Sequence, residues 1–104
     1  MSQEIRFGLE EKTIAKISKV FKKHQEIQAA VIYGSRAKGN YKPGSDIDLT
    51  LKAPTLNTTD LLKIENELEE LLLPYKIDLS LFHQIETPDL IEHINRIGII
   101  FYQS

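Results

Sequence analysis

Residues 34–49 read Gly-Ser-Arg-Ala-Lys-Gly-Asn-Tyr-Lys-Pro-Gly-Ser-Asp-Ile-Asp-Leu, and the patterns in and around this stretch decide the fold. The preceding segment, residues 27–33, is a short apolar run that ends at a glycine, which predicts a buried strand. Residues 46–52 alternate polar and apolar side chains, as a half-buried strand does. Residues 37–45 are rich in turn-forming residues and predict a loop between the two strands, with room for one helical turn before it.

Apolar residues outside this stretch recur at helical or at strand spacing, in alternation. We expect helices at residues 9–23, at residues 59–73 and between Thr87 and Gly98, and further strands at residues 76–82 and 99–102. Strands that alternate with helices predict an α/β (α+β) fold in which a mixed sheet is flanked by helices.

Residues at the ends of the predicted helices support these boundaries. Asn57 or Thr58 can cap the second helix, and Pro74 is expected to stop it. Thr87 is an expected N-cap with a proline directly after it, and Gly98 can end the last helix.

The composition is that of one soluble globular domain spanning residues 1–104. A net charge of -2 gives no overall field that would attract nucleic acid, so we expect none as a direct ligand. The absence of cysteine excludes disulfides and cysteine zinc sites. No apolar run reaches the roughly 18 residues of a membrane span, and the first residues lack the apolar core of a signal peptide. We therefore expect a cytoplasmic protein.

Gly34 and Ser35 follow the buried strand and predict a phosphate-binding turn. A glycine lets a backbone N–H approach a ligand closely, and the serine adds a hydroxyl. A helical turn after them would present free N–H groups to an anion, and Arg36 and Lys38 would add positive charge nearby. The alternative is a plain turn from strand to helix, in which Gly-Ser is common.

Asp46 and Asp48 predict a pair of carboxylates side by side on one face of a strand. Adjacent carboxylates repel each other, a cost that a hard cation such as Mg²⁺ removes. Asp78 lies between two apolar residues of the next predicted strand, where an acid is costly to bury unless it is paired or bound to metal. The alternatives are solvated acids at a strand end and on an edge strand.

A phosphate-binding turn beside three carboxylates on adjacent strands would form a two-metal site for in-line displacement at phosphorus. One metal would activate the acceptor hydroxyl, and the other would steady the phosphates and the leaving pyrophosphate. Each feature is weak by itself, and the combination indicates displacement at phosphorus.

Within residues 34–48, Gly-Ser followed after ten residues by Asp-x-Asp resembles the signature of the DNA polymerase beta-like nucleotidyltransferase superfamily. The local sequence is similar to its smallest members, the minimal nucleotidyltransferases (MNT domains). Asp78 matches the third acid of the family, and the resemblance covers roughly residues 28–83. Lys38 stands where the family often has arginine, which keeps the charge but not the forked donor geometry.

The resemblance implies the polymerase beta-like nucleotidyltransferase fold and a role for each motif residue. ATP would be the substrate and two Mg²⁺ ions the cofactors. The residues expected to bind nucleotide are Gly34, Ser35 and Arg36, and those expected to bind the metal ions and act in catalysis are Asp46, Asp48 and Asp78.

The resemblance also implies a partner. Minimal members resemble the antitoxin of a two-gene pair, in which the antitoxin adds AMP to a small helical HEPN-type ribonuclease toxin. Larger relatives have a further domain for which 104 residues leave no room, so a homo- or hetero-oligomer would complete the site. Two other functions remain open: transfer to a small molecule such as an aminoglycoside, and a non-catalytic module that neutralises its partner by occlusion.

Other features point to ordinary structure. His24, His83 and His93 lack the spacing of metal ligands, and we expect surface or structural roles for them. The apolar residues at 71–73 and 99–102 would serve either as core or as an interface.

Overall fold

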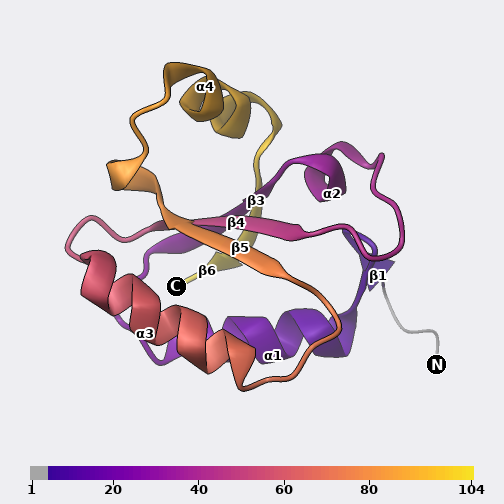
Figure 1. The fold of residues 1–104 in the computed structure, drawn as a ribbon, viewed down its shortest axis with the longest axis horizontal. Coiled ribbons are helices and arrows are strands. Elements are labelled where there is room, and N and C mark those ends of the chain that lie inside the picture. Colours follow the sequence, from indigo (N-terminus) through magenta and orange to yellow (C-terminus); the bar gives the residue numbers. More distant parts are fainter. Residues whose placement is uncertain (1–4) are drawn as a thin grey trace.

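Four strands form the central sheet of the computed structural model, which describes residues 5–104. They are β3 (Ala29–Tyr33), β4 (Ile47–Lys52), β5 (Ile77–Leu81) and β6 (Ile99–Gln103), in the spatial order β5-β4-β3-β6. β3 runs antiparallel to both of its neighbours, whereas β4 and β5 run parallel (Figure 1). The sheet is mixed, as predicted from the sequence.

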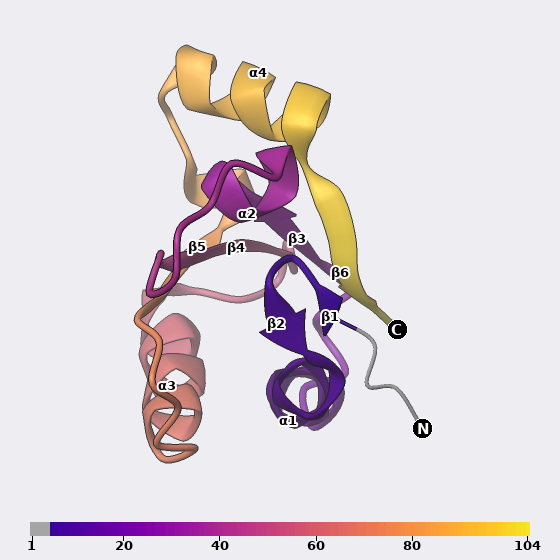
Figure 2. The same cartoon turned by 90° about the vertical axis from the view of Figure 1, so that its right-hand side faces the viewer.

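Helices lie on both faces of this sheet (Figure 2). One face carries α1 (Glu11–Lys22) and α3 (Thr58–Glu69), and the other carries α4 (Pro88–Ile97) and the short α2 (Ser35–Lys38). Further short elements are β1 (Ile5–Arg6), β2 (Leu9–Glu10) and the 3-10 turn η1 (Phe82–Gln84). Nowhere in residues 5–104 is a helix both long enough and apolar enough to cross a membrane.

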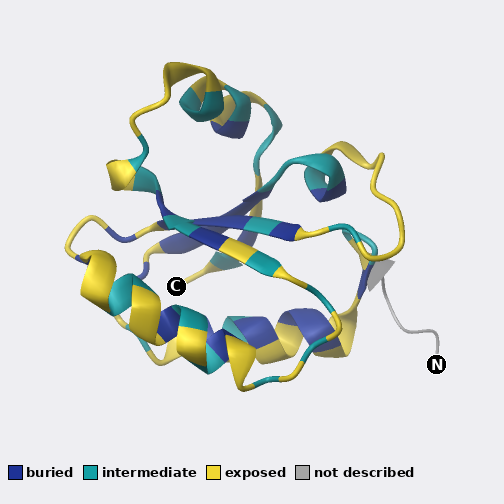
Figure 3. Ribbon diagram, in the orientation of Figure 1, coloured by how far each residue is buried: buried dark blue, intermediate teal, exposed yellow. Residues whose placement is uncertain are grey.

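The main core lies between the sheet and the layer formed by α1 and α3 (Figure 3). Strand alternation turns Ile47, Leu49 and Leu51 of β4 toward this layer, and all three are fully buried. The polar residues between them, Asp48 and Thr50, face the side of the sheet where α4 lies. The alternation therefore gives β4 one apolar face for the core and one polar face for chemistry.

The second predicted helix begins as expected and ends early. Asn57 is its cap, since the Asn57 side chain accepts from the Asp60 amide over 3.0 Å and the Asp60 carboxylate accepts from the Asn57 amide over 2.9 Å. The helix ends at Glu69, so the prediction that Pro74 stops it is wrong. The chain has already turned at Leu72, which has a φ of 54°.

The apolar residues after this helix divide between core and surface. Leu71 and Leu73 are partly buried and pack against the core, whereas the side chain of Leu72 is 87% exposed. In β6, Phe101 is buried and both Ile99 and Ile100 are exposed. Neither segment is therefore purely core.

The first predicted helix starts later than expected, whereas the last one begins after Thr87 and ends at Gly98 as predicted. The first helix begins at Glu11 rather than at residue 9, because the preceding residues pair as the β1–β2 hairpin. Thr87 makes no side-chain capping hydrogen bond. Gly98 ends α4 without adopting a left-handed conformation, and a Cβ there would collide with the Ile94 carbonyl and lie 2.6 Å from Val31 Cγ1. A glycine is needed because α4 packs closely on β3.

Candidate active site

The turn after β3 brings Gly34 against the side chain of Asp48. Gly34 has a φ of 74° and a ψ of -152°, a region that is essentially restricted to glycine. A Cβ at this position would lie 2.5 Å from Asp48 Oδ2. α2 begins at Ser35, and the first amides of a helix have no partner within it. The Gly-Ser turn therefore lies directly against one of the predicted acids.

The three predicted acids lie near the same end of the neighbouring strands β4 and β5. Asp48 and Asp78 are register partners in the parallel ladder of β4 and β5, and Asp46 precedes β4. Burial raises the pKa of the Asp48 carboxyl above its ordinary value of 3.8, and the charges of Asp78 and Asp46 raise it further. Asp48 is half-buried, whereas Asp46 and Asp78 are exposed.

Two hydroxyl groups join β4 to β5 two residues beyond Asp48 and Asp78. Ser80 Oγ donates to Thr50 Oγ1 over 2.9 Å, and Thr50 Oγ1 donates to the Ser80 carbonyl over 3.5 Å. Thr50 is fully buried. These hydrogen bonds satisfy a buried polar group and fix the separation of the two strands that carry the acids.

Arg36 is buried and its guanidinium binds main-chain oxygens. Nε and Nη2 donate to the Ser45 carbonyl over 3.1 Å and 2.8 Å, and Nη1 donates to the Phe7 carbonyl over 2.8 Å. The rings of Tyr41 and Tyr75 lie 5.4 Å and 5.1 Å from the guanidinium carbon. This geometry ties the loop before β4 to the N-terminal hairpin, and we therefore leave Arg36 out of the nucleotide-binding set.

His93 of α4 contacts the Gly-Ser turn, which was not expected from the sequence. The Gly34 amide donates to His93 Nε2 over 3.3 Å, and the rings of His93 and Tyr33 meet edge to face with centroids 6.2 Å apart. Burial raises the pKa of the Tyr33 phenol above its ordinary value of 10.0. Helical periodicity could have indicated that His93 faces the sheet, because His93 lies on the same helix face as Leu90 and the buried Ile94.

A family model described as Polymerase beta, Nucleotidyltransferase matches residues 15–104 of this chain. The chain belongs to this nucleotidyltransferase family. The matched range contains the Gly34 turn and all three acids. The fold predicted from the family resemblance, that of the polymerase beta-like nucleotidyltransferases, is confirmed. No curated protein matches the chain.

Solved structures are similar in fold to this nucleotidyltransferase domain. A toxin–antitoxin crystal structure with AMP-PNP has a TM-score of 0.71 and 22% identity, covering 88% of this chain and 73% of that chain. A complex of tri-AMPylated Shewanella oneidensis HEPN toxin with MNT antitoxin has a TM-score of 0.67 and 20% identity, covering 90% and 72%. A putative nucleotidyltransferase from Sulfolobus solfataricus has a TM-score of 0.53 and 20% identity, covering 86% and 78%.

The nucleotidyltransferase domain offers Mg²⁺ the oxygen donors that this ion prefers, at Asp46, Asp48 and Asp78. The raised pKa of Asp48 reflects, in part, repulsion from the other two carboxylates that a bound cation would remove. Within residues 5–104, no three Asp, Glu, His or Cys side chains lie close enough together to hold a metal ion. The donor chemistry fits Mg²⁺, and side-chain movement or substrate phosphate oxygens would have to complete its coordination.

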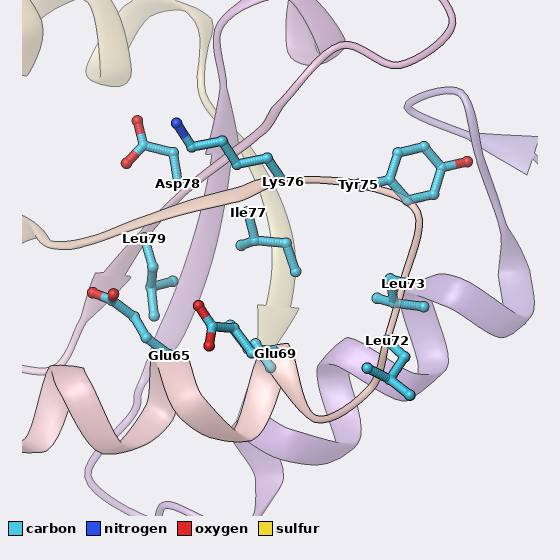
Figure 4. A pocket seen from close by; sticks show the side chains of 10 residues that line it. Glu65, Glu69, Leu72, Leu73, Tyr75, Lys76, Ile77, Asp78 and Leu79 are labelled. Atoms are coloured by element: carbon cyan, nitrogen blue, oxygen red, sulfur yellow. The ribbon is translucent and has the colours of Figure 1, made fainter.

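A cavity of about 500 Å³ opens between α3 and β5 of the nucleotidyltransferase domain, and Asp78 is among its lining residues. Figure 4 shows the side chains of Asp78 and Lys76 on one side of β5, and those of Ile77 and Leu79 on the side toward α3. β5 is at the edge of the sheet, so Asp78 can be approached from outside.

Proposed function

We propose that this chain is a Mg²⁺-dependent nucleotidyltransferase that moves AMP from ATP onto a partner protein. The observation that carries the proposal is the register match of Asp48 with Asp78, directly beside the Gly34 turn. Displacement at phosphorus depends on holding phosphates next to clustered carboxylates that bind a divalent cation. The membership of the nucleotidyltransferase family supports this chemistry.

Each motif residue has a role in the proposed reaction. Gly34 has no side chain and lets the triphosphate approach the turn closely, and Ser35 holds it through its backbone N–H and its hydroxyl. Asp46, Asp48 and Asp78 hold Mg²⁺, with two ions expected from the resemblance. When bound, magnesium supplies charge neutralisation for the phosphates and activation of the acceptor hydroxyl. The acceptor oxygen attacks the α-phosphorus, and pyrophosphate leaves. The acceptor can reach Asp78, which is exposed on the edge strand β5, and the Asp78 carboxylate takes the acceptor proton.

The partner that we propose is a HEPN-type toxin, which this domain would silence by AMP transfer as an antitoxin. The support comes from similar folds found in a toxin–antitoxin structure with AMP-PNP and in a complex of an AMPylated HEPN toxin with an MNT antitoxin. We propose a cytoplasmic hetero-oligomer, with the single domain of 104 residues bound to the toxin.

The experiment that tests this function is co-expression with the product of the neighbouring gene, followed by incubation with Mg²⁺ and labelled ATP. One sample carries the label at the α-phosphate and another at the γ-phosphate. The test variant is Asp46→Asn/Asp48→Asn. The matched control is Asp89→Asn, which removes an exposed acid in the first turn of α4, outside the predicted acid set.

Label on the partner from the α-position, present in the Asp89→Asn control and absent in the double variant, is the expected result. Label from neither position, with a tight complex still formed, would replace the proposal by neutralisation through occlusion. Label that moves to an added aminoglycoside, and not to the partner protein, would show a small-molecule acceptor instead.

A further inference from the structure

The turn that follows β3 lies against two groups that are far apart in the sequence. A Cβ on Gly34 would lie 2.5 Å from Asp48 Oδ2. The Gly34 amide donates to His93 Nε2 over 3.3 Å. His93 belongs to α4, which lies on the same side of the sheet as the turn (Figure 2).

We propose that His93 is a positioning residue that acts through the Gly34 amide. By accepting this hydrogen bond, the imidazole holds Gly34 in its glycine-restricted conformation and keeps the turn against Asp48. The inference rests on the proposed function, since it gives the held turn the task of orienting a triphosphate. His93 itself need not touch the nucleotide.

The donor and acceptor of this contact are fixed by chemistry. A backbone amide N–H can only donate, so Nε2 is the acceptor in this contact. The ring is also oriented by its neighbour, because Tyr33 meets it edge to face with an interplanar angle of 80°. Tyr33 directly precedes Gly34, so the ring is in contact with both residues of the peptide that enters the turn.

The packing of α4 does not depend on this side chain. Ile94 is the buried anchor of the helix, with a side chain 3% exposed, whereas His93 is half-buried. Gly98 brings the end of α4 onto Val31 of β3. A variant that shortens His93 should therefore keep the fold and release only the turn.

Three substitutions separate positioning from general stability. His93→Ala removes the acceptor, and His93→Gln can restore it because the glutamine amide oxygen can accept from the Gly34 amide. His24→Ala is the matched control, since His24 is also half-buried but pairs over 2.8 Å with Glu67 of α3, a helix on the opposite face of the sheet (Figure 2).

The first readout is amide hydrogen exchange of Gly34, measured by NMR on the folded protein without nucleotide. We expect exchange to accelerate about tenfold in His93→Ala, and to stay near the parent rate in His93→Gln and His24→Ala. Equal exchange rates at Gly34 in His93→Ala and the parent protein would overturn the proposal.

The second readout is AMP transfer by the complex with the partner protein. We expect kcat to fall about tenfold or more in His93→Ala with a smaller change in KM for ATP, and to recover in His93→Gln. Transfer by His93→Ala at the rate of His24→Ala would also overturn the proposal. A parent complex that transfers no label would instead refute the proposed function, and with it the role of the held turn in orienting a triphosphate.

Discussion

Asp48 of β4 and Asp78 of β5 occupy matched positions in two parallel strands, so their carboxylates lie side by side on the polar face of the sheet. Burial and neighbouring negative charge both raise the pKa of Asp48. Without a cation this arrangement costs stability, and with one it becomes a site for phosphate chemistry.

The first prediction concerns stability against pH in the absence of divalent ions. The native pKa of Asp48 is raised above 3.8, so the folded state binds more protons than the unfolded state in the window above that value. Stability should therefore be highest below the window and fall as pH rises through the raised pKa. Thermal melts in EDTA should show that Asp48→Asn removes this fall and raises the Tm by a few degrees at neutral pH. A lower Tm for this variant at neutral pH would contradict the assignment.

The second prediction concerns magnesium. Mg²⁺ should raise the Tm of the parent protein, and should leave the Tm of Asp46→Asn/Asp48→Asn close to its value without metal. A ligand at about 100 times its Kd stabilises a protein by about 2.7 kcal/mol, which is large enough to follow by thermal melting. Equal shifts in both proteins would place the cation elsewhere in the chain.

The third prediction concerns the turn glycine. Gly34→Ala should abolish transfer and destabilise the fold by more than Gly39→Ala. Both glycines have positive φ, but an added Cβ meets the Asp48 carboxylate at Gly34 and nothing within 4 Å at Gly39. Strain in the left-handed region costs about 1 kcal/mol in Gly39→Ala, whereas Gly34→Ala combines a more restricted backbone conformation with the collision. Urea unfolding and transfer assays on the two variants provide the comparison, and equal losses would refute the close contact with Asp48.

The fourth prediction concerns Arg36. Arg36→Lys should destabilise the protein by about 3 kcal/mol, because one ammonium cannot replace three guanidinium hydrogen bonds in a buried position. The matched control is Arg96→Lys, whose side chain is 61% exposed in its pair with Glu92 and should change stability by less than about 0.5 kcal/mol. Urea titration measures both values. A small effect in Arg36→Lys, together with weaker ATP binding, would return Arg36 to the nucleotide-binding set.

The sequence predicted the sheet strands well because each has a clear pattern. β4 alternates polar and apolar residues, and its neighbour β5 does the same. The β1–β2 hairpin was missed, since two-residue strands are too short to show alternation, and Leu9 fitted the helical stripe equally well. The predicted helix extended beyond the end of α3 because Leu71 and Leu73 continue the apolar pattern. In the structure these two residues reach the core from the turn that follows the helix.

The candidate site could be predicted only where its residues are close in sequence or match a strand pattern. Asp46 and Asp48 lie two residues apart, and Asp78 follows from the pairing of adjacent strands. His93 was expected to have a surface or structural role, because the local sequence does not show which backbone amide a histidine on a distant helix will contact. Arg36 was expected at the phosphate from its charge and its place after Ser35, and the sequence could not show that the Ser45 and Phe7 carbonyls would accept from its guanidinium.

The central position of β3 has a consequence for the order of folding. Its pairing with β4 joins Tyr33 to Asp48 across a short loop, whereas its pairing with β6 joins Ala29 to Gln103. Short loops close at a lower entropic cost, so we expect the β3–β4 unit to form first, as pulsed hydrogen exchange during refolding would show. On the ribosome, the Gly34 turn and its first acids would then emerge before the strand that covers the other edge of β3. That uncovered edge is where a newly made chain would be most exposed to wrong pairing and to chaperones.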